Sequence, residues 1–199
     1  MISFYFSDIS TPTLHQLRHY LLEHNALEVG EKESADFNIS HLDYPEMQAL
    51  EFKHLLHASL NPNLSWLQPQ TFYIDDLCWP RVISEIREQC LNHPWILKPS
   101  MLNNGQSIKI FTSVDEIAHH FQNPSRLGGP HVLQAYIDKP HLLKGPEHGH
   151  KYSIRMFMLM TESLAYLYPH GYFNIALKPY VSHDFHHLRA HLTNEHLEH

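Results

Sequence analysis

The chain has 199 residues, 43% of them hydrophobic and 18% charged, which suffices for one domain or two small ones with a buried core. Asp and Glu outnumber Lys and Arg by 21 to 14, and this balance excludes a broad basic surface for gripping nucleic acid. Twenty histidines bring the effective charge at pH 7 from −7 to roughly −2. Two cysteines, no membrane-length apolar run and no signal peptide lead us to expect a cytoplasmic protein.

Before residue 60 the sequence predicts a small α/β unit. A strand is expected at Ile2–Phe6 because this run is apolar and aromatic, and Asp36–Ser40 is a weaker strand candidate. Helices are expected to begin at Pro12 and at Pro45, the second running to about Ser59. The turn-rich segment 61–63 is a plausible boundary after this unit.

The middle of the chain predicts strands alternating with two helices. The strands are Thr71–Ile74, Trp95–Lys98, Ser107–Phe111 and His131–Tyr136; the helices are Pro80–Leu91, with Ile83, Ile86 and Cys90 inward, and one capped by Ser113. Asn104-Gly105 is a strong signal for a two-residue hairpin turn between the second and third strands. We therefore expect a mixed sheet with few helices.

After residue 150 the sequence predicts two long strands. They are Lys151–Met160 and Leu164–Pro169, joined by a tight turn. Their aromatic residues are expected to pack in a core: Phe157, Tyr166, Tyr168 and Phe173.

Two features of these strands suggest an anion site. Lys98 ends an apolar strand just before the Asn/Gly turn, so its ammonium could lie over a phosphate with the turn above it as a lid. Strand alternation sends Lys151, Ser153 and Arg155 to one face. Each feature alone also fits an ordinary solvated strand, so both interpretations stay open.

The order of these segments is more specific than any one of them. The runs WILKPS, NNGQSIKIF, VLQAYIDKPHLL, HKYSIRMFML, AYLYPHGYF, LKPY and HLTN together resemble the tubulin–tyrosine ligase family over about Gln68 to Asn194. The resemblance implies an α+β, ATP-grasp-like fold with mixed and antiparallel sheets, flanking helices and a small α/β lead domain. It divides the chain into residues 1–65 (lead domain), 66–133 (central lobe) and 134–199 (C-terminal lobe, expected to be incomplete).

The same resemblance implies an ATP-dependent carboxylate–amine ligase. Such an enzyme joins an amino acid to a protein or peptide carboxylate through an acyl phosphate, with ATP and Mg²⁺ as cofactors. The partners implied are ATP, a free amino acid and a polypeptide acceptor, with no nucleic acid or membrane.

Residue roles follow from the motif positions. The resemblance assigns nucleotide binding to Lys98, Gln134, Ala135, Tyr136, Ile137, Lys151, Thr193 and Asn194. It assigns catalysis to Lys151 and Arg155, which match the lysine and arginine of the family's K-x-D-x-R strand. The four residues from Gln134 to Ile137 correspond to the hinge between lobes, whose backbone receives adenine.

Several positions depart from the family pattern. Ser153 replaces an aspartate, Ala135 a lysine, and Asn174 an arginine that holds a substrate carboxylate. The family's Mg²⁺ ligands lie beyond the HLTN motif, and five residues follow Asn194 here. We therefore expect either part of a longer protein or a chain without the metal site, and a non-catalytic ligase-like binding module is the alternative function.

The histidines support a third, weaker hypothesis. His183 and His187 are four residues apart, as are His187 and His191, and on a helix such pairs could share zinc. No cysteine lies near them, and histidines are scattered over the whole chain. Compositional bias is therefore the preferred interpretation over a histidine-rich metal-binding protein.

Overall fold

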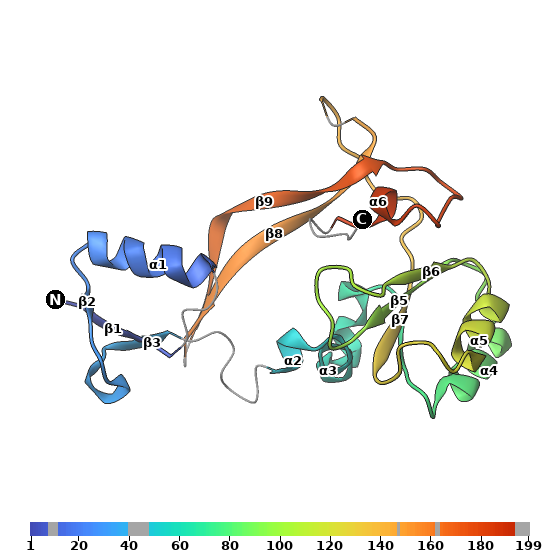
Figure 1. Cartoon of the computed structure of the whole chain (residues 1–199), viewed down its shortest axis with the longest axis horizontal. Coiled ribbons are helices and arrows are strands. Elements are labelled where there is room, and N and C mark those ends of the chain that lie inside the picture. Colours follow the sequence, from blue (N-terminus) through green and yellow to red (C-terminus); the bar gives the residue numbers. More distant parts are fainter. Residues whose placement is uncertain (8–11, 40–47, 147, 162–163, 194–199) are drawn as a thin grey trace. The chain divides into compact units, whose positions relative to one another are not determined.

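A computed structural model describes residues 1–7, 12–39, 48–146, 148–161 and 164–193 (Figure 1). The chain forms two compact units, residues 1–51 and 52–199, and each is described by itself. The predicted helix start at Pro45 lies outside the described residues. The three-part division expected from the family resemblance stays a prediction.

The first unit contains a short parallel sheet in the order β2-β1-β3. Its strands are β1 (Ser3–Phe6), β2 (Leu27–Glu28) and β3 (Phe37–Ile39). Helix α1 (Pro12–Glu23), the 3₁₀ turn η1 (Lys32–Ser34) and the short helix α2 (Gln48–Glu51) complete it. Phe4 on the central strand is buried, as expected where helical crossovers cover a parallel sheet.

The second unit begins with α3 (Lys53–Ser59) and the 3₁₀ helix η3 (Pro62–Leu67). The sequence predicted one helix up to Ser59, but α2 and α3 are separate. The reason is Phe52, whose φ of −89° and ψ of 120° are extended and interrupt the helical hydrogen bonds.

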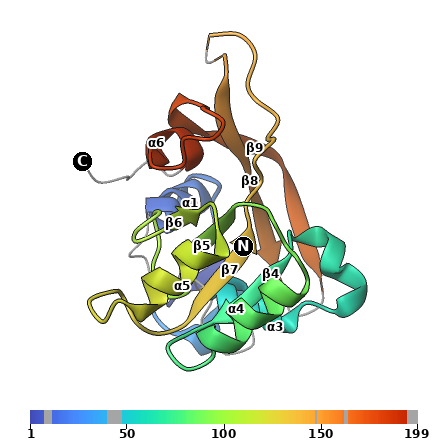
Figure 2. The same cartoon turned by 90° about the vertical axis from the view of Figure 1, so that its right-hand side faces the viewer.

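A four-stranded antiparallel sheet forms the centre of the second unit, in the order β4-β7-β5-β6. Its strands are β4 (Thr71–Ile74), β5 (Trp95–Pro99), β6 (Lys109–Phe111) and β7 (His131–Ala135), close to the predicted ranges. Helices α4 (Trp79–Glu88) and α5 (Val114–Gln122) lie together on one side of it (Figure 2). The sheet thus presents one helix-covered face and one face available for a site.

The helix-covered face holds the main hydrophobic core. Trp95 and Leu97 of β5 point into it beside Leu133 of β7, while Ile86 and Ile117 enter from α4 and α5. Ile83 and Ile86 are inward as predicted. The inward prediction for Cys90 is wrong: α4 ends at Glu88, and Cys90 is exposed with a left-handed φ of 51°.

The opposite face of β5 is covered by the C-terminal segment. Ile96 packs there with Tyr136, Phe185 and Leu192, and α6 (Leu188–His191) lies over this second cluster. Because alternate residues of a strand face opposite sides, Lys98 shares this face with Ile96. The second face is therefore where the predicted phosphate lysine lies.

The last two strands form a separate antiparallel ribbon, β8 (His150–Met160) with β9 (Ala165–Pro179). β9 extends ten residues beyond the predicted end at Pro169. The predicted burial of Phe157, Tyr166, Tyr168 and Phe173 is wrong, since each side chain is between 46% and 56% exposed. A two-stranded ribbon with no described layer over this stretch cannot bury its side chains.

The described residues thus form a mixed α/β fold with three sheets and flanking helices. Among the residues described, no helix is long and apolar enough to cross a membrane. The chemistry-bearing lysines lie where the four-stranded sheet meets the base of the ribbon.

Candidate functional site

Lys98 is held by a neutral partner on the face of the sheet opposite α4 and α5. Its Nζ donates to Oε1 of Gln134 at 2.7 Å, and Nε2 of Gln134 donates to Oγ1 of Thr71 at 2.8 Å. The side chains of three neighbouring strands therefore position one ammonium. Gln134 and Lys98 were both predicted site residues, and the structure brings them together.

Lys151 lies at the start of β8 against the hinge. Its Nζ donates to the Tyr136 hydroxyl at 3.0 Å and to the Ile137 carbonyl at 3.4 Å, and lies 4.2 Å from the Tyr136 ring centroid. This combination of a hydrogen bond and a cation–π contact fixes the ammonium without a carboxylate. Lys151, Tyr136 and Ile137 thus form a second group of predicted site residues.

Burial shifts the pKa of both ammonium groups in the same direction. The pKa of Lys98 is lowered to about 8. Burial is the main cause, and the charge of nearby Lys53 is the second. Burial lowers the pKa of Lys151 to about 8 as well, with Lys98 as the second cause. Among the residues described, neither lysine forms an ion pair with Asp or Glu, so an incoming anion would relieve the cost of both charges.

The hinge offers one open backbone donor. The N–H of Ala135 donates to the Gln70 carbonyl and that of Tyr136 to the Pro94 carbonyl, both at 2.8 Å. Within the described part of the chain, the N–H of Ile137 has no such partner. Adenine recognition by this hinge would therefore use Ile137 rather than Ala135 or Tyr136.

The remaining predicted residues divide into two groups. Thr193 meets Ser153, with 2.9 Å between their hydroxyl oxygens, so the HLTN segment and the K-x-S-x-R strand converge. Arg155 is exposed in β8, and its guanidinium group forms no hydrogen bond or ion pair with any described residue. Asn194 lies outside the described residues.

Asn174 faces the same side of the ribbon as Ser153, its partner in the strand register. The Asn174 side chain is buried, and its Oδ1 accepts no hydrogen bond from the residues described. A buried acceptor without a partner is costly unless a ligand or water supplies a donor. The Oδ1 atom of Asn174 is therefore a buried acceptor, beside Ser153, that a ligand donor could satisfy.

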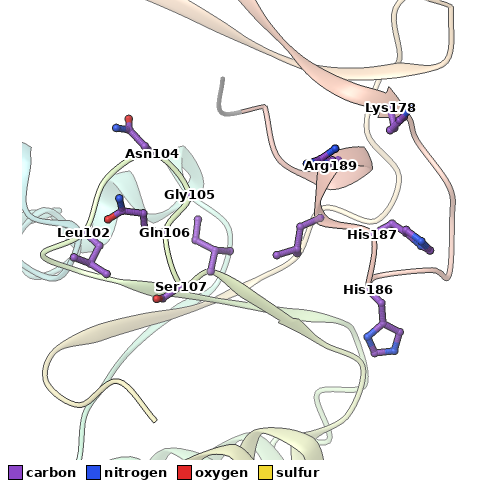
Figure 3. Close-up of a pocket in the computed structure, with 11 residues that line it drawn as sticks. Leu102, Asn104, Gly105, Gln106, Ser107, Lys178, His186, His187 and Arg189 are labelled. Carbon is purple, nitrogen blue, oxygen red and sulfur yellow. The ribbon is translucent and has the colours of Figure 1, made fainter. Parts of the chain in front are cut away.

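A cleft of about 780 Å³ opens between the segment 102–108 and the segment 186–189 (Figure 3). Asn104, Gly105 and Gln106 form one wall, while Lys178 and Arg189 lie across from them. Among the described residues that line the cleft, none is acidic. Its apolar side chains Ile108 and Leu188 belong to the cluster around Tyr136, which connects the cleft to the hinge.

The wall formed by residues 102–108 is a wide loop, not the predicted two-residue hairpin. β5 ends at Pro99 and β6 begins at Lys109. Asn104 and Gly105 have left-handed φ values of 55° and 79°, so the predicted turn residues act inside the loop. Helix α3 anchors the loop through Lys53, whose Nζ donates to the Leu102 carbonyl at 2.8 Å.

The histidine geometry differs from the zinc hypothesis. α6 begins at Leu188, so His183 and His187 are not on one helix. His191 uses both ring nitrogens, with Tyr136 and the Asp184 carbonyl. No group of three or more His, Cys, Asp or Glu residues could hold a metal ion in the part of the chain that is described.

Sequence reasoning missed several polar residues of this region. Tyr180 donates to the Asp138 carbonyl at 2.7 Å and its ring lies 5.2 Å from that of His191. Lys178 and Arg189 line the cleft. The LKPY and HLTN runs were a usable signal, because they contain or adjoin these residues.

Comparison with known proteins agrees with the motif pattern. A model of the tubulin-tyrosine ligase family matches residues 31–199. Protein polyglycylase TTLL10 of Macaca fascicularis is 29% identical over 119 residues, which cover 52% of this chain and 18% of that protein. The proteins of the same name from Rattus norvegicus and Mus musculus are also 29% identical, with 17% and 16% of their lengths covered.

A fourth relative carries a different name. Inactive polyglycylase TTLL10 of Homo sapiens is 29% identical over 119 residues, covering 52% of this chain and 17% of that protein. The match thus spans less than a fifth of each of these relatives.

Proposed function

Because the chain belongs to the tubulin-tyrosine ligase family, we propose that it holds ATP for an ATP-grasp-type ligase that joins an amino acid to a polypeptide carboxylate. The observation that carries this proposal is the pair of partly buried ammonium groups of Lys98 and Lys151. Among the described residues, both ammonium groups hydrogen-bond only to neutral groups. Both also have a pKa lowered to about 8. A polyphosphate is the ligand that such a pair is suited to neutralise.

The remaining geometry supports one position for the nucleotide. Adenine would accept from the N–H of Ile137, the open donor of the hinge. The phosphates would extend toward Lys98 and Lys151, and the loop 102–108 would close over them. That loop has the left-handed turn residues and backbone N–H groups from which anion-binding lids are built.

The proposed reaction proceeds in two steps. A carboxylate oxygen of the acceptor attacks the γ-phosphorus, the bond to the β–γ bridging oxygen breaks, and ADP leaves with that electron pair. An amine nitrogen then attacks the acyl carbon, phosphate leaves, and the amine loses a proton. Lys98 and Lys151 contribute by neutralising phosphate charge and fixing its position before either step.

Magnesium is part of the chemistry of the family, and phosphoryl transfer generally uses it to neutralise phosphate charge. The residues described do not fit this ion, because no cluster of carboxylate or imidazole ligands occurs among them. We therefore derive no step through the metal.

Thermal unfolding with a non-hydrolysable ATP analogue tests the proposal. The analogue should raise the melting temperature by several degrees, and Lys98→Ala should abolish the shift. Lys109→Ala is the matched control, because Lys109 is exposed and pairs with Leu97 on the helix-covered face of the sheet. Absence of a shift at millimolar nucleotide with folded protein would refute nucleotide binding.

The pH dependence of binding provides a second test. Phosphate beside Lys98 and Lys151 should restore their ordinary pKa values, so binding takes up protons near pH 8. Affinity should be highest and constant well below pH 8. Above pH 8 it should fall by up to about tenfold per pH unit for each lysine. Calorimetry in buffers of different ionisation enthalpy measures the proton uptake directly.

A non-catalytic binding module is the second candidate. The hydroxyl of Ser153, in place of the family's aspartate, is engaged by Thr193, and Arg155 has no partner among the described residues. The human relative is also named inactive. Incorporation of labelled glycine, the amino acid suggested by the polyglycylase name, into tubulin would favour the enzyme; ATP binding without incorporation or ADP release would favour the module.

A further inference from the structure

His191 is a buried histidine that the proposed chemistry does not use. Its side chain is 2% exposed, and its ring lies 5.8 Å from that of Tyr136, 5.2 Å from that of Tyr180 and 5.3 Å from that of Phe185. A buried imidazole among three aromatic rings needs a partner at each nitrogen. Both partners are present, and they are of different kinds.

The two partners fix which nitrogen carries the proton. Nε2 of His191 lies 2.7 Å from the carbonyl oxygen of Asp184, and a carbonyl can only accept. Nε2 must therefore be the protonated nitrogen. Nδ1 of the neutral ring then presents a lone pair to the Tyr136 hydroxyl, 2.8 Å away, and accepts its proton.

This direction continues to Lys151. Because the Tyr136 hydroxyl donates to His191, its lone pairs are left for the Lys151 Nζ at 3.0 Å, which can only donate. If Nδ1 carried a proton, the bond from the Tyr136 hydroxyl to His191 would be lost, and this hydroxyl would have to turn its hydrogen toward the neighbouring Tyr180 hydroxyl. The donor order from Lys151 through Tyr136 and His191 to Asp184 therefore follows from the neutral Nε2–H ring.

We propose that His191 is a positioning residue that holds the Lys151 ammonium in place through the Tyr136 hydroxyl. The consequence for nucleotide binding rests on the proposed function, whereas the hydrogen-bond order does not. His191 touches neither substrate nor nucleotide in this arrangement. It acts by making Tyr136 a fixed acceptor on the side that faces Lys151.

The charges around the ring keep it neutral. Burial is the largest influence and lowers the pKa of His191; Lys151 and His187 lower it further, while the carbonyl and the carboxylate of Asp184 raise it. Tyr136 and Tyr180 face the ring as neutral phenols, since burial raises the pKa of both. Protonation of Nδ1 in acid would reverse the bond to Tyr136 and release Lys151.

The protonation state can be observed directly. Nitrogen-15 NMR of the full chain with labelled histidine, assigned with His191→Gln, should show a neutral ring protonated at Nε2 at pH 7. A ring protonated at Nδ1, or a charged ring at that pH, would overturn the proposal. This measurement does not involve nucleotide, so it tests the hydrogen-bond order even if ATP fails to bind.

Two substitutions separate positioning from packing. The amide oxygen of His191→Asn takes approximately the place of Nδ1 and keeps an acceptor for Tyr136, whereas the amide of His191→Gln reaches the place of Nε2 and keeps only the bond to Asp184. We expect affinity for the ATP analogue to fall about tenfold in His191→Gln and in Tyr136→Phe. In His191→Asn it should stay within about threefold of the parent value.

The comparison is made between variants whose thermal unfolding shows a folded chain. Equal losses in His191→Asn and His191→Gln would mean that the histidine only fills space, and would refute the positioning role. No binding by the parent protein would instead refute the proposed function, leaving the NMR result to decide the hydrogen-bond order.

Discussion

The four-stranded sheet and the β8–β9 ribbon are both antiparallel and both rich in large apolar residues, yet they bury them very differently. Leu133 in β7 is 0% exposed, while Leu167 in β9 is 65% exposed. The difference is the layer of α4 and α5 on one face of the sheet and the C-terminal segment on the other. Apolar character gives a strand the capacity for burial, and only a second layer realises it.

The same comparison explains where the site lies. The ribbon is partly covered only near its base, from His150 to Ser153 in β8 and around Asn174 and Ala176 in β9. Lys151 belongs to that covered base, and Lys98 to the sheet beside it. Burial at this junction lowers the pKa of both ammonium groups, which an ammonium on the exposed half would not experience.

The largest expected effect comes from one leucine truncation made in both regions. Leu133→Ala should lower the free energy of unfolding by about 3–4 kcal/mol because it leaves a cavity, whereas Leu167→Ala should change it by less than about 0.5 kcal/mol. Urea unfolding followed by tryptophan fluorescence measures both, since Trp66, Trp79 and Trp95 all lie in residues 52–199. Equal losses would mean that the exposed half of the ribbon is covered in solution.

A smaller effect is expected at Gly171, within the ribbon itself. A Cβ there would overlap the carbonyl oxygen of Arg155, a backbone atom that cannot move without disturbing the ladder. Gly171→Ala should lower the local opening free energy of ribbon amides by about 2 kcal/mol in hydrogen exchange, with sheet amides unchanged. Gly30→Ala, with open space around its Cβ, is the control and should leave both sets unchanged.

The smallest effect is a gain in stability from removing a site residue. Lys98 has a folded pKa of about 8, below its unfolded value, so its buried charge destabilises the fold below pH 8, and this cost fades as pH rises toward 10. Lys98→Met should therefore raise the free energy of unfolding at pH 7 by about 1 kcal/mol, after the lost bond to Gln134 is subtracted. At pH 10 the gain should vanish. A loss of stability at pH 7 would show that Lys98 serves structure rather than ligand binding.

Local patterns predicted much of the sheet and of the lysine placement. Strand β4 matches its prediction, β5 and β7 match within one residue, and α5 begins directly after its predicted cap, Ser113. Two predictions were wrong because of the conformation of a single residue: the helix is interrupted at Phe52, and Cys90 is exposed after α4 ends. A third was wrong because no described layer covers the aromatic residues of the ribbon. None of these depends on the periodicity from which elements are predicted.

The sequence by itself determined the family pattern, the strand that ends at Lys98 and the face shared by Lys151 and Ser153, because order, spacing and alternation are local properties of the chain. The tertiary structure alone decided the partners: Gln134 for Lys98, Tyr136 for Lys151, and His191 behind Tyr136. Those contacts join residues 15 to 55 positions apart. Their hydrogen-bond directions follow from which atoms burial leaves next to one another, and no local pattern contains that information.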